Sequence, residues 1–172
     1  MAHDTIQTAY ITALKNTHAM EQQALQIMNR QVERIESYPE MSKLLKNHIK
    51  ETETQRTRLE LALKAVDEDP STIKEAVLGF VGNVMAMGHI PADDEVLKNS
   101  LANHAFENYE IAAYTTLITI AEEAGQQQFI SEFQKSLAEE KAMAENVHDL
   151  IEPTTQRYLK IAVREGTSSA KI

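Results

Sequence analysis

Two glutamates, Glu107 and Glu110, stand three residues apart in the segment ENYEIAAYTTLITIAEE (107–123). This spacing puts both carboxylates on one face of a helix. The same face carries the apolar side chains Phe106, Ala113, Tyr114, Leu117 and Ala121. An ionised carboxylate costs several kcal/mol to bury without a partner. Two acids on the face that a helix should bury therefore need a chemical explanation.

Each of the other long helical segments also places one acid on its apolar stripe: Glu21, Glu51 and Glu140. Their spacing is regular, because Glu21 to Glu51 and Glu110 to Glu140 are both 30 residues, and each member of the first pair precedes its counterpart by 89 residues. Two helical hairpins related by this offset would bring four glutamates to a similar depth in a bundle.

Three arrangements can relieve buried acids: protonation, pairing with a buried Lys or Arg, or a shared cation. Basic residues are scarce on these stripes, and Arg58 alone among the nearby residues could turn inward. Hard ions bound by carboxylate oxygens and an imidazole satisfy the set most simply. The sequence therefore predicts a two-metal carboxylate site.

The role of several neighbours stays open in the sequence. His48, one turn before Glu51, is either a ligand or a residue that orients a carboxylate, and Glu107 either binds metal or lines the pocket. His18 and His104 are expected to orient ligands or to be partly exposed. Tyr114, one turn beyond Glu110, is expected to be a core aromatic with a bonded hydroxyl; the alternative is a hydrogen-bond or radical partner of the site.

The elements that position these residues are helices. Only 5 glycines and 4 prolines occur among 172 residues, and good helix formers are frequent. Pro39 fits a first helical turn, Gly125 a helix stop, and Pro153 an interruption. The expected helices are 5–36, 39–66, 71–87, 94–124, 126–151 and 154–165, in one domain of residues 1–172.

Four of these helices are long and form two tight pairs, separated by a long connection that holds one short helix. Two hairpins joined by one crossover are the connectivity of ferritin-like bundles. The predicted fold is therefore an all-α, ferritin-like four-helix bundle with a short helix in the crossover and a short C-terminal helix.

The overall charge of −9 argues against a nucleic-acid partner, because such binding needs basic clusters. No apolar run reaches the ~20 residues that cross a bilayer. The N-terminal segment does not read as a secretory signal, so a cytoplasmic location is expected. Without cysteine, thiolate ligands are excluded.

Five stretches of the sequence carry a resemblance to a known family: THAMEQQA (17–24), YPEM (38–41), HIKETETQ (48–55), FENYEIAAYTTL (106–117) and EEKAMAE (139–145). They lie on all four long helices in the expected order. With them the chain resembles the YciE/YciF family of bacterial ferritin-like stress proteins, and is more similar to YciE.

The resemblance implies a ferritin-like homodimer associated with the bacterial stress response. The wider superfamily uses two metal ions, iron or manganese, and zinc can replace them in a crystal. Its four glutamate ligands match Glu21, Glu51, Glu110 and Glu140, of which Glu51 and Glu140 would be candidate bridging ligands.

The match departs from the superfamily at the histidines. Its usual Glu-x-x-His pattern is missing, because Thr54 follows Glu51 and Met143 follows Glu140. The predicted ligand set is instead Glu21, His48, Glu51, Glu107, Glu110 and Glu140. Five carboxylates and one imidazole would make the site more anionic than usual.

Two functions follow as hypotheses. The first is a dimetal protein that reacts with peroxide or oxygen, or that handles iron, under stress. The alternative is a non-catalytic dimeric stress protein with a structural or vestigial metal site. An iron-storing mini-ferritin cage is a third possibility, but no sequence feature identifies its assembly surface or its pore.

Overall fold

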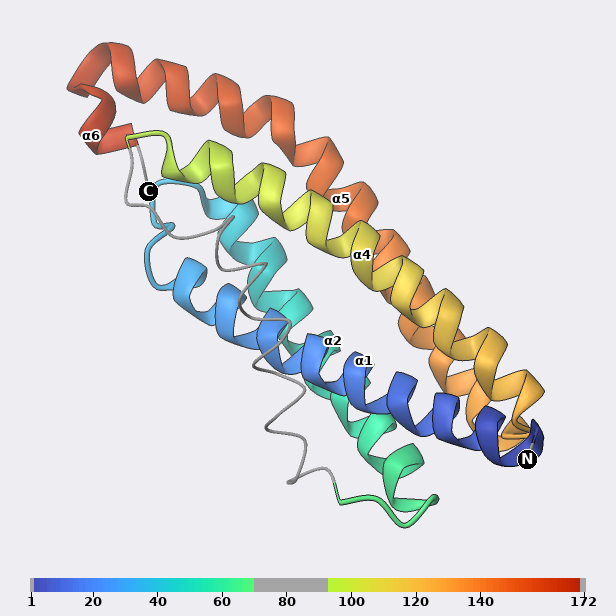
Figure 1. Cartoon of the computed structure of the whole chain (residues 1–172). Coiled ribbons are helices and arrows are strands. Elements are labelled where there is room, and N and C mark those ends of the chain that lie inside the picture. Colours follow the sequence, from blue (N-terminus) through green and yellow to red (C-terminus); the bar gives the residue numbers. More distant parts are fainter. Residues whose placement is uncertain (1, 70–92, 171–172) are drawn as a thin grey trace.

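The protein folds as a bundle of four long helices and no strand in the part of the chain that the structure describes. The computed structural model describes residues 2–69 and 93–170. Its helices are α1 (Ala2–Val32), α2 (Pro39–Lys64), α4 (Glu95–Glu123), α5 (Gln127–Glu165) and the single turn α6 (Thr167–Ala170). Both α1 and α5 pack against α2 and against α4, so the four long helices enclose one interior (Figure 1).

The order of the helices gives the bundle its ferritin-like connectivity. α1 and α2 form one antiparallel hairpin, α4 and α5 form the other, and α2 ends at the opposite end of the bundle from the start of α4 (Figure 1). One long connection between two hairpins distinguishes this arrangement from an up-down-up-down bundle. The predicted all-α fold is confirmed, while the helix expected at 71–87 lies outside the described residues.

The turn between α1 and α2 begins earlier than the predicted end of the first helix at residue 36. α1 ends at Val32, and the chain then turns both Ile35 and Tyr38 into the core. Pro39 occupies the first turn of α2, where its missing N–H needs no partner, and the Tyr38 carbonyl accepts the bond from Ser42 N at 2.9 Å. Burial of two large side chains therefore sets the length of α1.

Two helix ends close with the same hydrogen-bond pattern. After α4, Gly125 N donates to Glu122 O at 3.1 Å and Gln126 N donates to Ala121 O at 2.9 Å, with Gly125 at φ 73°. After α2, Asp67 takes the equivalent left-handed position at φ 59°. Both ends are Schellman motifs, which favour glycine at this position. The predicted helix stop at Gly125 is confirmed.

The predicted break at Pro153 is wrong. α5 continues through Pro153 to Glu165, which joins the two helices expected at 126–151 and 154–165. A proline inside a helix removes one hydrogen bond and costs ~3 kcal/mol. Here Thr154 and Tyr158 are buried on the next turns, and Tyr38 donates a hydrogen bond to the Ala170 carbonyl beyond α5. Packing of the C-terminal half of α5 outweighs the local cost.

The interior is divided into two apolar clusters with polar side chains between them. One cluster lies toward the start of α1 and includes Tyr10, Leu14, Leu59, Leu117 and Phe133. The other lies toward the α1–α2 turn and includes Met28, Tyr38, Leu45, Val96 and Val147. On every long helix, the buried acids or histidine fall between residues of the two clusters. A polar layer thus crosses the middle of the bundle.

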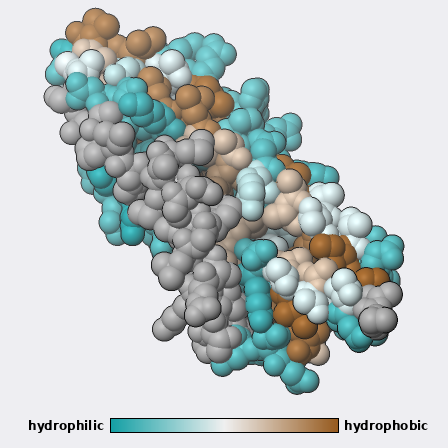
Figure 2. Space-filling model, viewed as in Figure 1, coloured by the Kyte–Doolittle hydropathy of each residue, from teal (hydrophilic) through white to brown (hydrophobic). Residues whose placement is uncertain are grey.

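The outer surface is mostly polar, with apolar areas along it (Figure 2). The large apolar side chains exposed in the described part are Leu61, Leu101, Tyr109, Leu159 and Val163. None of the helices described there combines the length and the apolar character needed to cross a membrane.

Candidate metal centre

Four potential metal ligands meet in the polar layer: His48, Glu107, Glu110 and Glu140. One ligand atom from each lies within 4.8 Å of all the others, and all four residues are buried. His48 Nε2 is 3.5 Å from Glu107 Oε2 and 3.4 Å from Glu140 Oε2. The fold therefore places side by side four residues of α2, α4 and α5 that the sequence analysis predicted as ligands.

Regular spacing on each helix explains this meeting. The buried positions of α2 recur every three or four residues, through Met41, Leu45, His48, Thr52, Gln55 and Leu59. Those of α5 follow the same rule through Phe133, Ser136, Glu140, Met143 and Val147. Such spacing keeps one stripe of a helix toward the core. His48 and Glu140 are thus core positions by spacing and polar by residue type.

Glu21 brings a fourth helix to the same place. It is fully buried on α1, and its carboxylate interacts electrostatically with Glu140, His48 and Glu107. The Tyr114 hydroxyl donates a hydrogen bond to Glu21 Oε1 at 2.5 Å. The bonded hydroxyl expected for Tyr114 is present, and its partner is Glu21. We call His48, Glu107, Glu110, Glu140 and Glu21 the carboxylate pocket.

The expectation that Glu51 lies on the buried stripe is wrong. Its side chain is 50 % exposed, and Glu51 Oε2 accepts a hydrogen bond from His48 Nδ1 at 2.9 Å. The reason is angular, because the buried positions His48 and Thr52 leave Glu51 at the edge of the stripe. A carboxylate that holds Nδ1–H leaves Nε2 facing the pocket, which is how an imidazole ligand is usually oriented.

Unpaired oxygens give the pocket its chemical character. Glu21 Oε2, Glu110 Oε2 and Glu140 Oε1 are buried without a hydrogen-bond partner. Glu107 Oε2 and Glu140 Oε2 also lack a hydrogen bond and have only the longer contact with His48 Nε2, at 3.5 and 3.4 Å. Buried polar atoms are normally hydrogen-bonded, so a group of orphaned acceptors needs a reason. Oxygen atoms with free lone pairs around one imidazole fit a hard metal ion. The donor atoms of the pocket are therefore suited to bind a metal ion.

The raised pKa values of pocket residues show that positive charge stabilises the pocket. Burial raises the pKa of Glu110 well above its usual range, and Glu140 and Glu107 raise it further. Burial likewise raises the pKa of Glu107 to about 7, against the opposing effect of His48. Burial disfavours the charged imidazole, but Glu107, Glu140 and Glu51 outweigh it and raise the pKa of His48 to about 12. Without a metal ion, protons supply the missing positive charge.

Tyr114 borders the carboxylate pocket through its hydrogen bond to Glu21. Burial and the Glu21 carboxylate raise the pKa of Tyr114 well above its ordinary value, whereas a hydrogen bond from Ser136 lowers it. Ser136 is itself fully buried on α5. Neither the Ser136 contact nor the partner of Tyr114 could be identified from one helix alone, since each joins two helices.

Two further histidines considered in the sequence analysis, His18 and His104, lie outside the pocket. His18 is buried, with Nε2 at 3.4 Å from Glu60 Oε1, and burial lowers its pKa. His104 Nδ1 is 3.3 Å from the Ala144 carbonyl, and its ring lies 5.4 Å from that of His148. The partial exposure expected for these two residues holds for His104 and not for His18.

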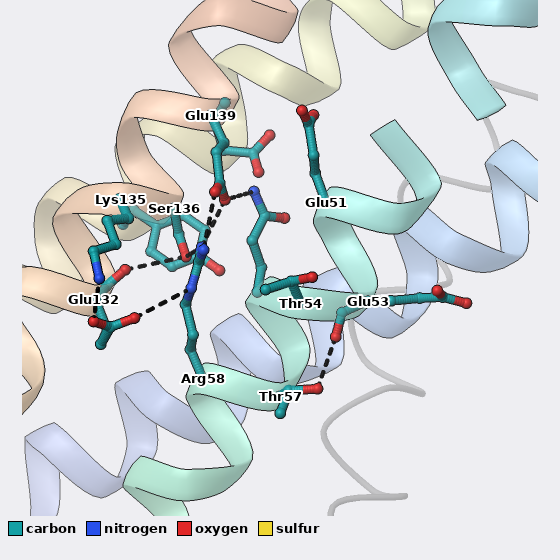
Figure 3. Close-up of polar contacts among 12 residues, drawn as sticks. Glu51, Glu53, Thr54, Thr57, Arg58, Glu132, Lys135, Ser136 and Glu139 are labelled. Atoms are coloured by element: carbon teal, nitrogen blue, oxygen red, sulfur yellow. Dashed lines mark hydrogen bonds and ion pairs between the residues drawn. The ribbon is translucent and has the colours of Figure 1, made fainter. Parts of the chain in front are cut away.

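Arg58, the one nearby basic residue that the sequence suggested could turn inward, does not enter the pocket. Its guanidinium lies between α2 and α5 and binds both oxygens of Glu139, with Nη1 at 2.6 Å from Oε2 and Nη2 at 3.0 Å from Oε1 (Figure 3). The Glu139 carboxylate also accepts a hydrogen bond from Gln55 Nε2 at 3.0 Å. The pocket carboxylates therefore have no arginine partner among the described residues.

A four-helix bundle with carboxylates and an imidazole buried at its middle defines the protein as ferritin-like, with a cluster that could hold a metal ion. The chain belongs to the family described as a domain of unknown function, DUF892, whose model matches residues 5–160. It is also 28 % identical over 152 residues to protein YciF of Escherichia coli K12, a match that covers 85 % of this chain and 90 % of YciF. The YciE/YciF prediction is confirmed through YciF, and a nearer likeness to YciE stays a prediction.

Solved structures show the same fold. A protein from Xanthomonas campestris pv. campestris is 27 % identical, with a TM-score of 0.74, over 90 % of this chain and 96 % of that one. The Escherichia coli stress protein YciF is 21 % identical in the structural alignment, with a TM-score of 0.68, over 85 % and 94 % of the two chains. At this identity, the second likeness concerns the fold alone.

Proposed function

We propose that the protein binds two metal ions, iron or manganese, in the carboxylate pocket, and that it reacts with peroxide or oxygen, or handles iron, during bacterial stress. One observation carries the proposal. Buried carboxylate oxygens from three helices lack hydrogen-bond partners around a buried imidazole from the fourth. The likeness to YciF, itself described as a stress protein, supports the stress context.

Charge supports two ions. The pocket contains four carboxylates, those of Glu21, Glu107, Glu110 and Glu140, within reach of one another. Two divalent ions would balance four negative charges, and this balance would lower the free-energy cost of burying the carboxylates. His48 would bind through Nε2 while Glu51 holds Nδ1. In this assignment Glu51 orients a ligand, whereas the sequence prediction made it a ligand.

Bound iron or manganese would supply the electrons exchanged with peroxide or oxygen. The chain's own contribution is to hold and shield the ions. Apolar clusters above and below the polar layer exclude bulk water from the carboxylates. Exclusion of water strengthens the attraction between each carboxylate and a cation, because the local dielectric is low.

Metal analysis tests the proposal directly. Protein produced with added iron or manganese is expected to carry about two ions per chain, and Glu140→Ala is expected to lose them. Glu145, exposed on the same helix, supplies the matched control Glu145→Ala, which should load like the wild type. Wild-type protein with well under one ion per chain would refute the proposal. Glu51→Ala separates the two assignments: weakened loading fits an orienting residue, and complete loss fits a ligand.

A non-catalytic role with a structural ion is the second candidate, because the pocket is closed. Glu21, His48 and Glu140 are almost fully buried, and the groove between α1 and α4 is lined by none of them. Rapid oxidation of ferrous iron or consumption of peroxide by metal-loaded protein would exclude this candidate. Loaded protein without either reaction would establish it.

We further propose a cytoplasmic homodimer that uses the surface between α1 and α4. A groove of about 820 Å³ runs there, lined by small residues such as Ala9, Ala13, Ala112 and Thr116. The face in Figure 2 carries white and pale-brown side chains along these helices. Small residues allow two helical surfaces to approach closely. Light scattering should give twice the chain mass, and Ala112→Arg should give the mass of one chain; a wild-type monomer would refute the dimer.

A further inference from the structure

A pair of histidines lies between α4 and α5, outside the carboxylate pocket. The ring of His104 on α4 is 5.4 Å from the ring of His148 on α5, measured between the ring centres, and the two ring planes are tilted by 46°. His104 is partly exposed and His148 is exposed, so solvent reaches the pair. Imidazole is the commonest metal ligand among side chains. Two imidazoles this close together are therefore a candidate metal site.

The contact of His104 with α5 determines which of its nitrogens can bind an ion. His104 Nδ1 is 3.3 Å from the Ala144 carbonyl oxygen. A carbonyl can only accept a hydrogen bond, so Nδ1 carries the proton, and the neutral ring has its free lone pair on Nε2. Metal-binding histidines have this arrangement, in which one ring nitrogen donates to a carbonyl and the other binds the ion. The contact thus prepares His104 to bind an ion through Nε2.

The separation of the two rings suits one shared ion. When their nitrogens lie about 2.0–2.1 Å from a tetrahedral ion, two imidazoles have ring centres roughly 5 Å apart. The separation of 5.4 Å between His104 and His148 is close to this value. The exposed ring of His148 can turn about its terminal torsion, which has broad minima. We therefore expect both histidines to reach one ion without a movement of either helix.

The histidine pair favours other metal ions than the carboxylate pocket does. Oxygen-rich sites such as the pocket favour hard ions, whereas two imidazoles with water in the remaining positions favour borderline ions such as zinc(II) and copper(II). Glu145 and Asp149 are exposed on α5, three residues before His148 and one residue after it. Their negative charge favours a cation in this region of the surface.

The pair is near the carboxylate pocket but separate from it. His104 precedes Glu107 by three residues on α4, and His148 follows Glu140 by eight residues on α5. At 1.5 Å per residue, these offsets correspond to about 5 Å and about 12 Å along the helix axes. Neither histidine belongs to the group of ligand atoms that meets in the pocket. A change at one site therefore need not remove the other.

We propose that His104 and His148 together bind one borderline divalent ion, zinc(II) or copper(II), at the surface between α4 and α5. This is a second metal site, with nitrogen ligands in place of the buried carboxylates. The inference goes beyond the proposed function and does not depend on it, because the pair shares no ligand with the carboxylate pocket.

Zinc titration tests the inference in the Glu140→Ala variant, in which the carboxylate pocket lacks one of its ligands. Calorimetry is expected to show about one zinc ion bound per chain. In this background, His104→Gln and His148→Gln should each weaken zinc binding about 100-fold, because two ligands held in place bind far more tightly than one. His3→Gln, at an exposed histidine of α1, is the matched control and should leave zinc binding unchanged.

The double variant His104→Gln/His148→Gln shows whether the two histidines act on the same ion. Either single change already leaves one imidazole, so the second change should add much less than the first. Zinc binding that survives either single change would overturn the inference. Effects of the two changes that multiply in the double variant would also overturn it, since they would indicate independent ions.

Nitrogen NMR of Glu140→Ala checks the geometry without a change at either histidine. Before zinc is added, and at a pH where the ring is neutral, His104 should show the signals of the Nδ1–H tautomer, as its contact with Ala144 requires. Added zinc should then shift one ring nitrogen of His104 and one of His148 over the same range of concentration. The opposite tautomer of His104, or a shift at one histidine alone, would overturn the inference.

Discussion

The carboxylate pocket is a place where single residues oppose folding. Glu110 is buried with one oxygen unpaired, and burial together with its acidic neighbours raises its pKa. Such a group destabilises the metal-free protein, and its attraction to a bound cation offsets this destabilisation. Stability and binding should therefore respond in opposite ways to the loss of its charge.

Glu110→Gln is expected to show this opposition. Because the amide keeps the shape and removes the charge, the metal-free variant should gain about 1–2 kcal/mol of unfolding free energy at pH 8. It should also lose the stabilisation that metal gives the wild type. Urea unfolding with chelator and with added manganese measures both effects, and Glu123→Gln on the exposed face of α4 is the control. A metal-free variant less stable than the wild type would contradict the argument.

The pH dependence of the metal-free protein follows from Glu107. Its pKa is about 7 in the folded chain, above the ordinary 4.5, so the folded state holds this proton more tightly than the unfolded state. The resulting stability is fully present below pH 4.5 and is lost as the pH rises to about 7. The contribution is at most about 3 kcal/mol. Thermal unfolding across this range should show a steeper decline for the wild type than for Glu107→Gln, and parallel curves would contradict it.

Most of the pocket could be predicted from the sequence, because a polar residue at a core position is visible in the spacing alone. Glu21, Glu107, Glu110 and Glu140 are buried as that spacing implies. The prediction for Glu51 was wrong because it relied on the position of Glu51 three residues after His48 and on the offset of 89 residues between Glu51 and Glu140. The regular series of buried residues on α2 passes through His48 and Thr52 instead. That series was the signal that could have separated the two.

At the scale of the elements, the C-terminal ends of α2 and α4 depend on backbone conformation more than on side-chain contacts. Gly125 and Asp67 occupy equivalent left-handed positions in two Schellman motifs. A side chain at Gly125 would meet no atom within 4 Å, so a substitution there is strained by the backbone alone. Only glycine adopts this conformation without a steric cost.

The two motifs make a matched pair of variants. Gly125→Ala should destabilise the protein by about 1 kcal/mol, and Asp67→Gly should stabilise it by up to about 1 kcal/mol. Urea unfolding of both variants measures the difference. Equal effects of the same sign would show that contacts, and not the left-handed conformation, govern these ends.

The continuity of α5 could not be predicted from the local sequence. Pro153 predicts a break by local rules, and only the burial of Tyr158 on the far side and the contact of Tyr38 with Ala170 explain why the helix continues. The Tyr38–Ala170 hydrogen bond joins residues that are 132 positions apart in the sequence.

For the whole molecule, the bundle and its connectivity were predictable because helix periodicity and short hairpin turns are local signals. The candidate metal centre would connect this architecture to stability, since the residues of the carboxylate pocket come from all four long helices. An ion bound there should hold the two hairpins together. Binding to the folded state alone raises stability according to the concentration of the ligand.

Manganese is therefore expected to raise the melting temperature. At about 100 times its dissociation constant, a ligand adds about 2.7 kcal/mol, which corresponds to roughly 5–10 °C for a domain of this size. Calorimetry with manganese and with chelator measures the shift, and Glu140→Ala should abolish it. A shift that persists in Glu140→Ala would place the bound ion elsewhere.

The burial of the pocket also has a consequence in time. Glu21 and His48 belong to the first hairpin, and Glu107, Glu110 and Glu140 to the second, and all five are shut off from solvent. An ion can therefore enter or leave only when the hairpins move apart. Exchange should then proceed at the rate of this opening, whatever the concentration of chelator. The lifetime of the bound ion would therefore measure how often the two hairpins separate.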